Sequence, residues 1–407
     1  MPQSSGQTRI FGFLAINCLN NFKPKYNILN CPEQISFIFE SDMPNQLLQY
    51  QIAISLIPGI GDVNAKKLIS YCGAAEAVFR ETKKNLLKIP GMGVATVNAI
   101  LSQNVLERAE QEMLFIEKNE ISTLYFLEKN YPTRLKSCLD SPVMLYFKGN
   151  ANLNASRVVS VVGTRRSTAY GREVCDQLIS DLTSPDLLVV SGLAYGIDTQ
   201  AHRSSVENNI PTVGILAHGL DRLYPAQNRA LSEKMVENGG LLTDFMSATV
   251  PDRENFPKRN RIVAGMADAL VVVESAKRGG ALITANIANS YNRDVFAFPG
   301  RVSDTYSEGC NYLIKTNKAA LIQNAADIRY LMNWDDVKKP GRQAKLFREL
   351  NPEEQQVMEI LKNGEPVGID YIVMQSKLSN SKIAAILLSL EFDGMVSSLP
   401  GKMYKAV

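Results

Sequence analysis

Residues 158–171 read Val-Val-Ser-Val-Val-Gly-Thr-Arg-Arg-Ser-Thr-Ala-Tyr-Gly, and the fold can be inferred outward from them. The largely apolar residues 158–162 predict a buried strand. Gly163 allows a tight turn after it, and Ser167 or Thr168 can cap a following helix. A strand that runs through a glycine turn into a helix is the repeating unit of a parallel α/β sheet, whose ligands lie beyond the carboxyl ends of the strands.

The same pattern recurs along the chain, with polar stretches compatible with helices between most of the apolar runs. The runs are Val158–Val162, Leu187–Val190, Thr212–Leu216, Gly240–Thr243, Ala269–Val273, Asp294–Phe298 and Ala319–Ile322. Residues 111–149 form a connecting segment before them, with one strand at Ile121–Phe126. We therefore predict an α/β domain over residues 111–334, built on a mostly parallel sheet with helices on both faces.

Residues 45–110 predict a small helical domain with an internal repeat. Its two turns, Pro58-Gly59-Ile60-Gly61 and Pro90-Gly91-Met92-Gly93, are typical of helix-hairpin-helix motifs. The backbone N–H groups of such turns can grip DNA phosphates without reading the sequence. Six cations against three acids in residues 45–104 fit weak backbone binding. A structural repeat that packs on its neighbour fits the pattern equally well.

The C-terminal part predicts a linker and a third domain. Residues 335–350 are charged and contain Pro340-Gly341, as a linker would. Residues 351–407 carry helical patterns at 353–362 and 381–392 and then a hairpin through Pro400-Gly401, an order that predicts a winged helix-turn-helix. Five cations against seven acids, and a largely apolar candidate recognition helix at Ser381–Phe392, favour a protein-contact or regulatory role over base readout.

Residues 1–44 show neither helical nor strand periodicity and are interrupted by Pro24 and Pro32. They predict a disordered extension, and Met43 is then a candidate for the true first residue. A targeting or regulatory arm is the alternative interpretation. Periodicity begins only after Met43.

The overall composition excludes several classes of protein. The chain has 407 residues, of which 45% are hydrophobic and 21% charged, so we expect two or three soluble domains rather than disorder. A net charge of +3 does not by itself identify a nucleic-acid binder. The six cysteines and two histidines are too dispersed for a zinc site of the usual spacing. No apolar run is long enough to span a bilayer, so we expect a cytoplasmic protein without a metal or cofactor.

Four loops meet at one edge of the predicted sheet, and three of them are basic or glycine-rich. They begin at Gly163, Gly192, His218 and Lys277, and the last contains Arg278-Gly279-Gly280 and leads into a helix at Thr284. Free N–H groups at helix N-termini, together with arginine, suit a phosphate group. One such loop alone would be weak evidence, but together they predict a phosphate-binding crevice.

The stretch Phe256-Pro257-Lys258-Arg259-Asn260-Arg261 adds three cations and an aromatic ring. A cationic groove with a ring for stacking is what single-stranded nucleic acid requires. The alternative is a solvated basic start of a helix. A cluster of cations at a helix N-terminus opposes the macrodipole, which weakens that alternative.

Three further polar residues near these loops do not assemble a catalytic set. Asp198 is expected to be structural, and His202 to be a packed or helix-face histidine. His218 lies where a catalytic residue could sit, but no serine–histidine–acid set surrounds it. The loop after residue 162 also lacks the third glycine of the nicotinamide fingerprint, which disfavours a dehydrogenase.

Taken together, the motifs resemble the DNA-processing protein A family (DprA, also called Smf). The resemblance rests on Val161–Arg165, Ser191–Asp198, Gly219–Asn228, Phe256–Gly265, Leu282–Ala285 and Phe298–Gly300, in the family's order. It covers residues 111–325 strongly. It implies a Rossmann-like sheet core with an N-terminal helix-hairpin-helix module and a C-terminal winged helix.

The resemblance also implies a function: a dimeric, non-enzymatic mediator that binds single-stranded DNA and loads the RecA recombinase in natural transformation. By motif, Arg165 would hold a phosphate, Lys258, Arg259 and Arg261 would line the path of the strand, and Phe256 would lie against a base. Residues Gly309–Ile322 would contribute to the dimer contact. The expected nucleic-acid-binding set is Gly163, Thr164, Arg165, Ser167, Gly192, Phe256, Lys258, Arg259, Asn260, Arg261, Gly279, Gly280 and Thr284.

Two positions depart from the family's pattern. Gly279-Gly280-Ala281 stands where Ser-Gly-Ser is more usual, and His218 stands where small residues are common. The competing interpretation is an enzyme related to nucleotide phosphoribohydrolases, which share a Rossmann core. Those enzymes carry a Pro-Gly-Gly-x-Gly-Thr loop with a catalytic glutamate. Glu274 precedes Gly279-Gly280 here, but the rest of that loop is missing.

Overall fold

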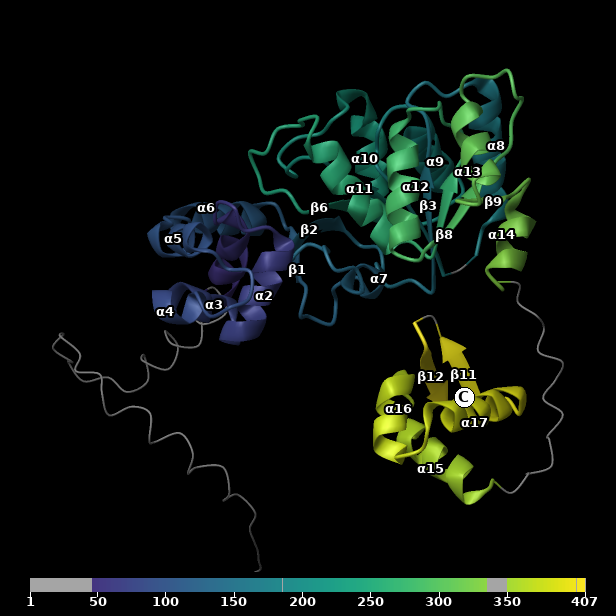
Figure 1. The fold of residues 1–407 in the computed structure, drawn as a ribbon. Helices are drawn as coiled ribbons and strands as arrows, with labels where there is room; N and C mark the ends of the chain where they lie inside the picture. Colours follow the sequence, from purple (N-terminus) through teal and green to yellow (C-terminus); the bar gives the residue numbers. More distant parts are fainter. Residues whose placement is uncertain (1–45, 185, 335–349, 400, 407) are drawn as a thin grey trace, which may run out of the picture. The chain divides into compact units, whose positions relative to one another are not determined.

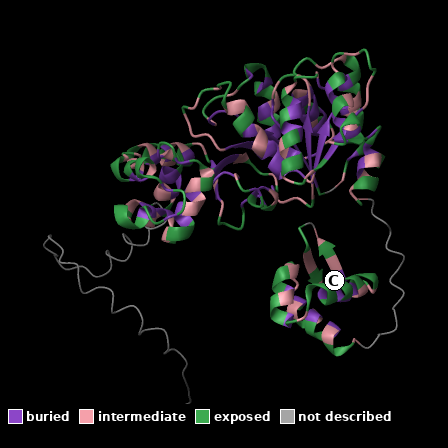
Figure 2. Ribbon diagram, viewed as in Figure 1, coloured by how far each residue is buried: buried purple, intermediate pink, exposed green. Residues whose placement is uncertain are grey.

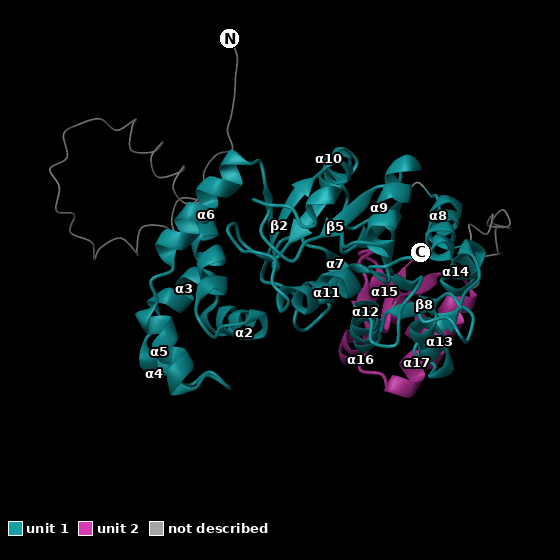
Figure 3. Cartoon of the chain, turned by 90° about the horizontal axis from the view of Figure 1, so that it is seen from above, with its two compact units in different colours: residues 1–334 teal, residues 335–407 magenta. Residues whose placement is uncertain are grey.

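The computed structural model describes residues 46–184, 186–334, 350–399 and 401–406. The expected extension at 1–44 and nearly all of the expected linker at 335–350 lie outside these ranges. The chain divides into two compact units, residues 1–334 and 335–407, shown in teal and magenta in Figure 3. In the described residues no helix combines the length and the apolar character that crossing a membrane needs.

The first unit is built on a nine-stranded sheet with the order β1-β2-β6-β5-β4-β3-β7-β8-β9 (Figure 1). The strands from β6 to β9 pair in parallel, whereas β2 is antiparallel to both β1 and β6. The strand bounds are β1 Ser122–Tyr125, β2 Met144–Gly149, β3 Arg157–Val162, β4 Leu187–Ser191, β5 Thr212–Ile215, β6 Gly239–Thr243, β7 Ala269–Val272, β8 Asp294–Ala297 and β9 Ala320–Leu321. The prediction of a mostly parallel sheet is confirmed.

Helices cover both faces of this sheet. Alternate residues of one strand point to opposite faces, so Val158 packs into one core and Val159 into the other. The first face carries α7 Thr133–Lys136, α11 Asn255–Met266, α12 Gly280–Ser290 and α13 Glu308–Lys315. The second carries α8 Ala169–Asp181, α9 Ile197–Glu207, α10 Arg229–Glu237 and α14 Ala325–Leu331. The short helix η2 Ala226–Asn228 precedes α10. Figure 2 shows the strands buried between the two helical layers.

The helical module precedes the sheet and shares a core with its edge. Residues 46–53 are helical, and the later elements are η1 Ile54–Leu56, α2 Asp62–Cys72, α3 Ala75–Arg80, α4 Lys83–Leu86, α5 Val94–Ser102 and α6 Leu106–Lys118. Its apolar core continues into Tyr125 of β1 and into Met144 and Tyr146 of β2. The strand β2 was not expected from the sequence, because Met144–Phe147 is a short apolar run close behind the Ser141-Pro142 turn. Its antiparallel pairing with β1 and β6 explains why it forms.

The second unit is a small helical domain with a three-stranded sheet. Its helices are α15 Pro352–Leu361, α16 Ile369–Ser376 and α17 Asn380–Phe392, and its strands β10 Val367–Gly368, β11 Val396–Leu399 and β12 Met403–Ala406 pair in the order β10-β12-β11. Asn351 and Glu354 form a capping box that fixes the start of α15. The helix α16 was missed from the sequence, but the winged-helix pattern of helices followed by a hairpin is confirmed.

Candidate nucleic-acid interface

A crevice of about 500 Å³ opens at the carboxyl ends of β3, β4 and β7. Its walls are the loop after β3, the loop after β4, the start of α11 and the N-terminus of α12. The expected site residues that line it are Gly163, Thr164, Arg165, Gly192, Phe256, Arg259, Asn260, Gly279, Gly280 and Thr284. Ser167, Lys258 and Arg261 are not among its lining residues. The loops predicted from the sequence therefore converge, although not every residue on them does.

The N-terminus of α12 lies in the crevice and has the geometry of a candidate anion site. Gly279 is the N-cap residue, and a side chain there would collide with Ser275. Gly280 is exposed, and a Cβ at this position would meet nothing within 4 Å. The N-terminus of this eleven-residue helix is thus accessible at Gly280, and its partial positive charge favours a phosphate.

Three exposed arginines surround this anion site. Arg165, Arg166 and Arg253 line the crevice, and among the described residues their guanidinium groups form no hydrogen bond or ion pair. Arg165 lies over the ring of Phe256, with 4.9 Å between its guanidinium carbon and the ring centroid. The ring of Tyr224 lies on Phe256 as well, at 6.0 Å between centroids. Arg166 and Arg253 were not in the expected set, although Arg166 directly follows Arg165.

Arg259 lies in the floor of the crevice and not on its surface. Its side chain is buried, with 4% of the residue exposed, and its Nη1 donates to the carbonyl oxygens of Gly192 and Ile215. Burial lowers the pKa of Arg259 to about 10, against the opposing charge of Asp198. The expectation placed Arg259 along the strand's path; the residue does line the crevice, but it is buried and its Nη1 is engaged by two carbonyl groups of the protein.

Asp198 is the buried counter-charge of Arg259. Burial raises the pKa of its carboxyl to about 6, and the charge of Arg259 and hydrogen bonds from the amides of Ala194 and Gly192 oppose that shift. Gly192 is needed at this point because a Cβ would collide with the guanidinium of Arg259. The structural interpretation of Asp198 agrees with these contacts, and Gly192 supports the floor of the crevice.

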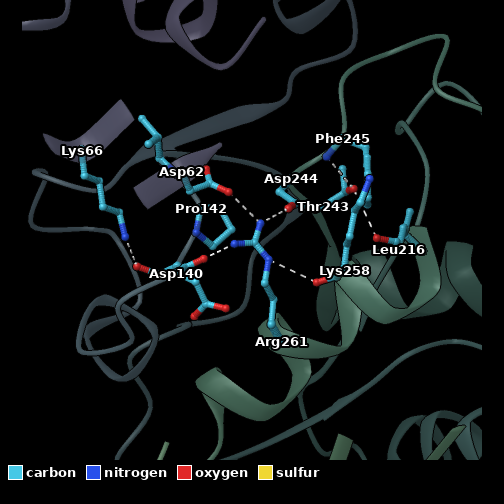
Figure 4. A network of polar contacts seen from close by, with 12 residues as sticks. Asp62, Lys66, Asp140, Pro142, Leu216, Thr243, Asp244, Phe245, Lys258 and Arg261 are labelled. Atoms are coloured by element: carbon cyan, nitrogen blue, oxygen red, sulfur yellow. Dashed lines mark hydrogen bonds and ion pairs between the residues drawn. The ribbon is translucent and has the colours of Figure 1, made fainter. Parts of the chain in front are cut away.

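Arg261 points away from the crevice. Residues that lie two positions apart on an α-helix are rotated by about 200° around its axis. Arg259 and Arg261 therefore project from nearly opposite faces of α11. Arg261 Nη2 lies 2.9 Å from Asp62 Oδ2 and 2.6 Å from Asp244 Oδ2, and Nη1 donates to the carbonyl oxygen of Asp140 (Figure 4). Burial lowers its pKa, but the carboxylates of Asp244 and Asp62 outweigh burial and the net shift is upward.

These contacts make Arg261 a clamp between the helical module and the sheet. Asp62 is the first residue of α2, and it also accepts a hydrogen bond from the backbone N–H of Val143 at 2.8 Å. Lys66, one turn further along α2, donates to Ser141 Oγ. Lys258 is exposed on the same side of α11 as this interface. The basic stretch of α11 is therefore divided: Arg259 faces the crevice, whereas Lys258 and Arg261 face the helical module.

Ser167 also lies outside the crevice. Its carbonyl oxygen accepts from Arg172 Nη1 at 2.7 Å. Thr168 caps α8, because its Oγ1 accepts from the N–H of Gly171 at 3.1 Å. The expected cap is thus confirmed at Thr168. Thr168 also donates to Glu274 Oε1, and its N–H donates to Glu274 Oε2, which leaves both oxygens of that buried carboxylate engaged.

Both histidines have structural roles. His202 is fully buried on α9, and its Nδ1 lies 2.7 Å from Thr212 Oγ1, which confirms the packed histidine. Burial lowers the pKa of His202 to about 3. His218 joins the ends of its own loop: Nδ1 lies 2.9 Å from the carbonyl oxygen of Gly219, and Nε2 accepts from the N–H of Tyr224 at 3.1 Å. Those partners require a neutral ring that carries its proton on Nδ1, and burial lowers its pKa accordingly.

The two turns of the helical module differ in their surroundings. The glycines of both turns are exposed, but the first turn leads into Asp62 and its ion pair with Arg261. Lys67 Nζ donates to the carbonyl oxygen of Pro90 at 3.0 Å and so lies beside the second turn. Among the described residues no group of three or more metal-ligating side chains is present.

Comparison with known proteins bears on the family and the fold of the chain. Residues 122–333 match the family DNA recombination-mediator protein A, and residues 343–402 match the DprA winged helix domain. The chain is 30% identical over 401 residues to Protein Smf of Synechocystis, covering 89% of this chain and 100% of that protein. It is 38% identical over 209 residues to the DNA processing protein DprA of Bacillus subtilis, covering 51% of this chain and 70% of that protein. The X-ray structure of DNA processing protein A from Streptococcus pneumoniae is similar, with a TM-score of 0.58 and 30% identity over 69% of this chain and 97% of that one.

Proposed function

This chain belongs to the DNA recombination-mediator protein A family, and from that premise we propose that it binds single-stranded DNA in the crevice at the carboxyl edge of its sheet. It acts as a mediator that hands the strand to the RecA recombinase in natural transformation, without catalysis of its own. The observation that carries the proposal is the set of three exposed arginines around the N-terminus of α12, whose guanidinium groups form no hydrogen bond or ion pair with the residues that the structure describes.

The crevice suits a strand of any sequence. Phosphates are held by the first amides of α12 and by Arg165, Arg166 and Arg253, none of which reads a base edge. Phe256 is partly buried beneath Arg165. When Arg165 turns from the ring to a phosphate, the uncovered face of Phe256 becomes available for a base to stack on. One movement of Arg165 thus supplies both contacts.

The competing enzyme function receives no support from Glu274. A catalytic glutamate needs an oxygen available to the substrate, and both oxygens of Glu274 are occupied by Thr168. Its side chain is also buried, with 2% of the residue exposed. We expect no release of free base when the protein is incubated with nucleoside monophosphates. Turnover that Glu274→Gln abolishes would instead favour the enzyme.

Fluorescence anisotropy with labelled single- and double-stranded oligonucleotides over a salt series tests the crevice. We expect tight single-strand binding that weakens steeply with salt, and a loss of tenfold or more in Arg165→Glu. Arg203→Glu is the matched control, because Arg203 is an exposed arginine of α9 outside the crevice. Equal binding by the two variants would overturn the proposed site. Arg259→Glu is a poor probe, since a buried residue of the floor would be lost.

Handover to the recombinase is tested separately. RecA ATPase activity on DNA coated with single-strand-binding protein should start sooner when the wild-type chain is added, and Arg165→Glu should fail to shorten the delay. No change with the wild type would contradict the mediator role while leaving DNA binding intact. A deletion strain with undiminished transformation frequency would contradict the role in natural transformation.

We place the dimer contact at residues Gly309–Ile322, as the family resemblance implies. The strand β9 pairs only with β8 among the described strands, which leaves one edge open. Tyr312 of α13 and Leu321 of β9 are 45% and 46% exposed. Light scattering should show a dimer that Leu321→Glu converts to a monomer. Leu101→Glu, at an equally exposed leucine of α5, is the control and should remain dimeric.

A further inference from the structure

A second pocket, of about 740 Å³, lies on the other side of α11, between the helical module and the edge of the sheet. Its walls are α2, the loop 244–249 after β6, Arg108 of α6, and Lys258 and Arg261 of α11. The family comparison and the crevice described above assign it no role. It shares no lining residue with the crevice, although both are lined by residues of the first turn of α11.

The pocket contains a buried acceptor without a donor. The side chain of Asp244 is 10% exposed, and its Oδ2 pairs with Arg261 Nη2 at 2.6 Å. The other oxygen, Oδ1, is buried and has no hydrogen-bond partner among the described residues. A buried carboxylate oxygen without a donor is costly. Because Asp244 lines the cavity, a ligand bound there can supply the missing donor.

The loop that carries Asp244 is held in shape by the protein itself. The N–H of Ser247 donates to Glu112 Oε1 at 2.9 Å, and the N–H of Ala248 donates to Asp221 Oδ1 at 3.0 Å. Ala248 adopts a φ of +66°, a conformation that L-residues other than glycine rarely adopt. Strained backbone that several contacts hold in place is typical of ligand-binding loops.

The remaining lining has the chemistry of a nucleotide site. Phe245, Met246 and Met144 offer apolar surface for a flat ring. Lys258 is exposed at the pocket, and its ammonium group makes no hydrogen bond or ion pair within the described ranges. Lys258, Phe245 and Asp244 all line this pocket, which therefore offers a cation, a ring and a hydrogen-bond acceptor together.

We propose that this pocket binds one base of the same DNA strand and prefers bases that carry an exocyclic amino group. The first turn of α11 separates the two sites, with Phe256 and Pro257 in the crevice and Lys258 in this pocket, so a strand can pass from one to the other over that turn. An amino N–H of cytosine, adenine or guanine donates to Asp244 Oδ1. Thymine presents a carbonyl oxygen at the corresponding position, and that oxygen is repelled by the carboxylate.

The inference rests on the proposed function, because the crevice must hold the strand. Homopolymers of deoxycytidine and thymidine of equal length test it, since both are pyrimidines that stack weakly. In anisotropy titrations of the full chain, we expect oligo-dC to bind roughly tenfold more tightly than oligo-dT, as one hydrogen bond to a charged group would provide. Asp244→Asn should remove that preference, because it weakens the hydrogen bond to cytosine and no longer repels the carbonyl oxygen of thymine.

Asp244→Asn also removes a partner of Arg261, so a second variant is needed. Phe245→Ala changes a half-buried ring and leaves the clamp intact, and it should lower the dC-to-dT ratio. Tyr330→Ala, at an exposed aromatic residue of α14, is the control and should keep the ratio. Circular dichroism checks that each variant is folded.

Each outcome decides one of the two proposals. Equal binding of oligo-dC and oligo-dT by the wild type, with normal salt dependence, would overturn the base pocket and leave the crevice intact. A preference that survives in both Asp244→Asn and Phe245→Ala would overturn it as well. Absence of binding to either oligonucleotide would overturn the proposed function itself. Free dCMP should bind far more weakly than oligo-dC, and equal affinity would assign the pocket to free nucleotides instead.

Discussion

Arg165 and Arg166, in the loop after β3, are exposed, and their guanidinium groups form no hydrogen bond or ion pair in the described part of the chain. The guanidinium groups of Arg259 and Arg261 of α11, by contrast, are held by several partners each. In the sequence the two stretches look alike, and the α11 stretch looks the richer in cations. In the fold, the loop after β3 presents cations to a ligand, and α11 uses two of its cations to hold the molecule together.

The difference comes from partners that are distant in the sequence. Arg261 pairs with Asp62, 199 positions away, and Arg259 donates to Gly192, 67 positions away. Local charge density therefore measures how many cations a segment has and not how many are available to DNA. The available ones are those for which the fold has placed no acceptor nearby.

The largest effect on stability is expected for Arg259→Ala. It leaves Asp198 as an uncompensated buried charge and removes the donor of two buried carbonyl groups, so the free energy of unfolding should fall by about 3–5 kcal/mol. Arg165→Ala should change it by less than about 0.5 kcal/mol. Urea unfolding followed by the fluorescence of Trp334, the single tryptophan, which packs against the core of the first unit, measures both. Similar losses of unfolding free energy for the two variants would contradict the distinction between a buried structural arginine and an exposed one.

Arg261→Ala should cost less, about 2–3 kcal/mol, because its side chain is 15% exposed and water can partly replace the lost partner. Combined with Asp62→Ala it forms a double-mutant cycle across the clamp. We expect a coupling energy of about 1–2 kcal/mol between the two residues. Strict additivity would mean that the helical module is not held to the sheet through this pair.

A smaller effect is the pH dependence of the folding stability, which comes from His202 and Asp198, two groups buried beneath the crevice. The pKa of buried His202 is lowered to about 3, whereas an unfolded histidine titrates near 6.5, so the folded chain binds fewer protons and loses stability as the pH falls below about 6.5. Asp198, with a raised pKa of about 6, acts in the opposite direction: its folded carboxyl takes up a proton first, which favours the folded state as the pH falls toward 3.8.

His202→Asn separates these two contributions. Relative to the variant, the wild type should lose about 1 kcal/mol of unfolding free energy for each pH unit below about 6. The comparison uses the same urea titrations at several pH values. Parallel pH profiles for wild type and variant would show that His202 is not held neutral in the folded chain.

The sequence was sufficient for the sheet and for the convergence of its loops. Strands such as Val158–Val162 are continuous apolar runs, and the rule that ligands bind at the carboxyl ends of parallel strands then located the crevice. The sequence could not predict that Arg259 and Arg261 are buried, because their accessibility depends on contacts with residues distant in the chain. It also missed β2, because Met144–Phe147 becomes a strand only through pairing with β1 and β6. Arg253 could have been found as an exposed cation just before α11.

The most direct test of the distinction between the DNA-binding arginines after β3 and the structural arginines of α11 is a crystal structure of the chain with a thymidine oligonucleotide. We predict phosphates at the N-terminus of α12 and at Arg165, with Phe256 uncovered and stacked on a base. Arg261 should remain between Asp62 and Asp244, without contact to DNA. A strand bound at the second turn of the helical module with the crevice empty, or Arg261 drawn out to a phosphate, would contradict the assignment of these arginines.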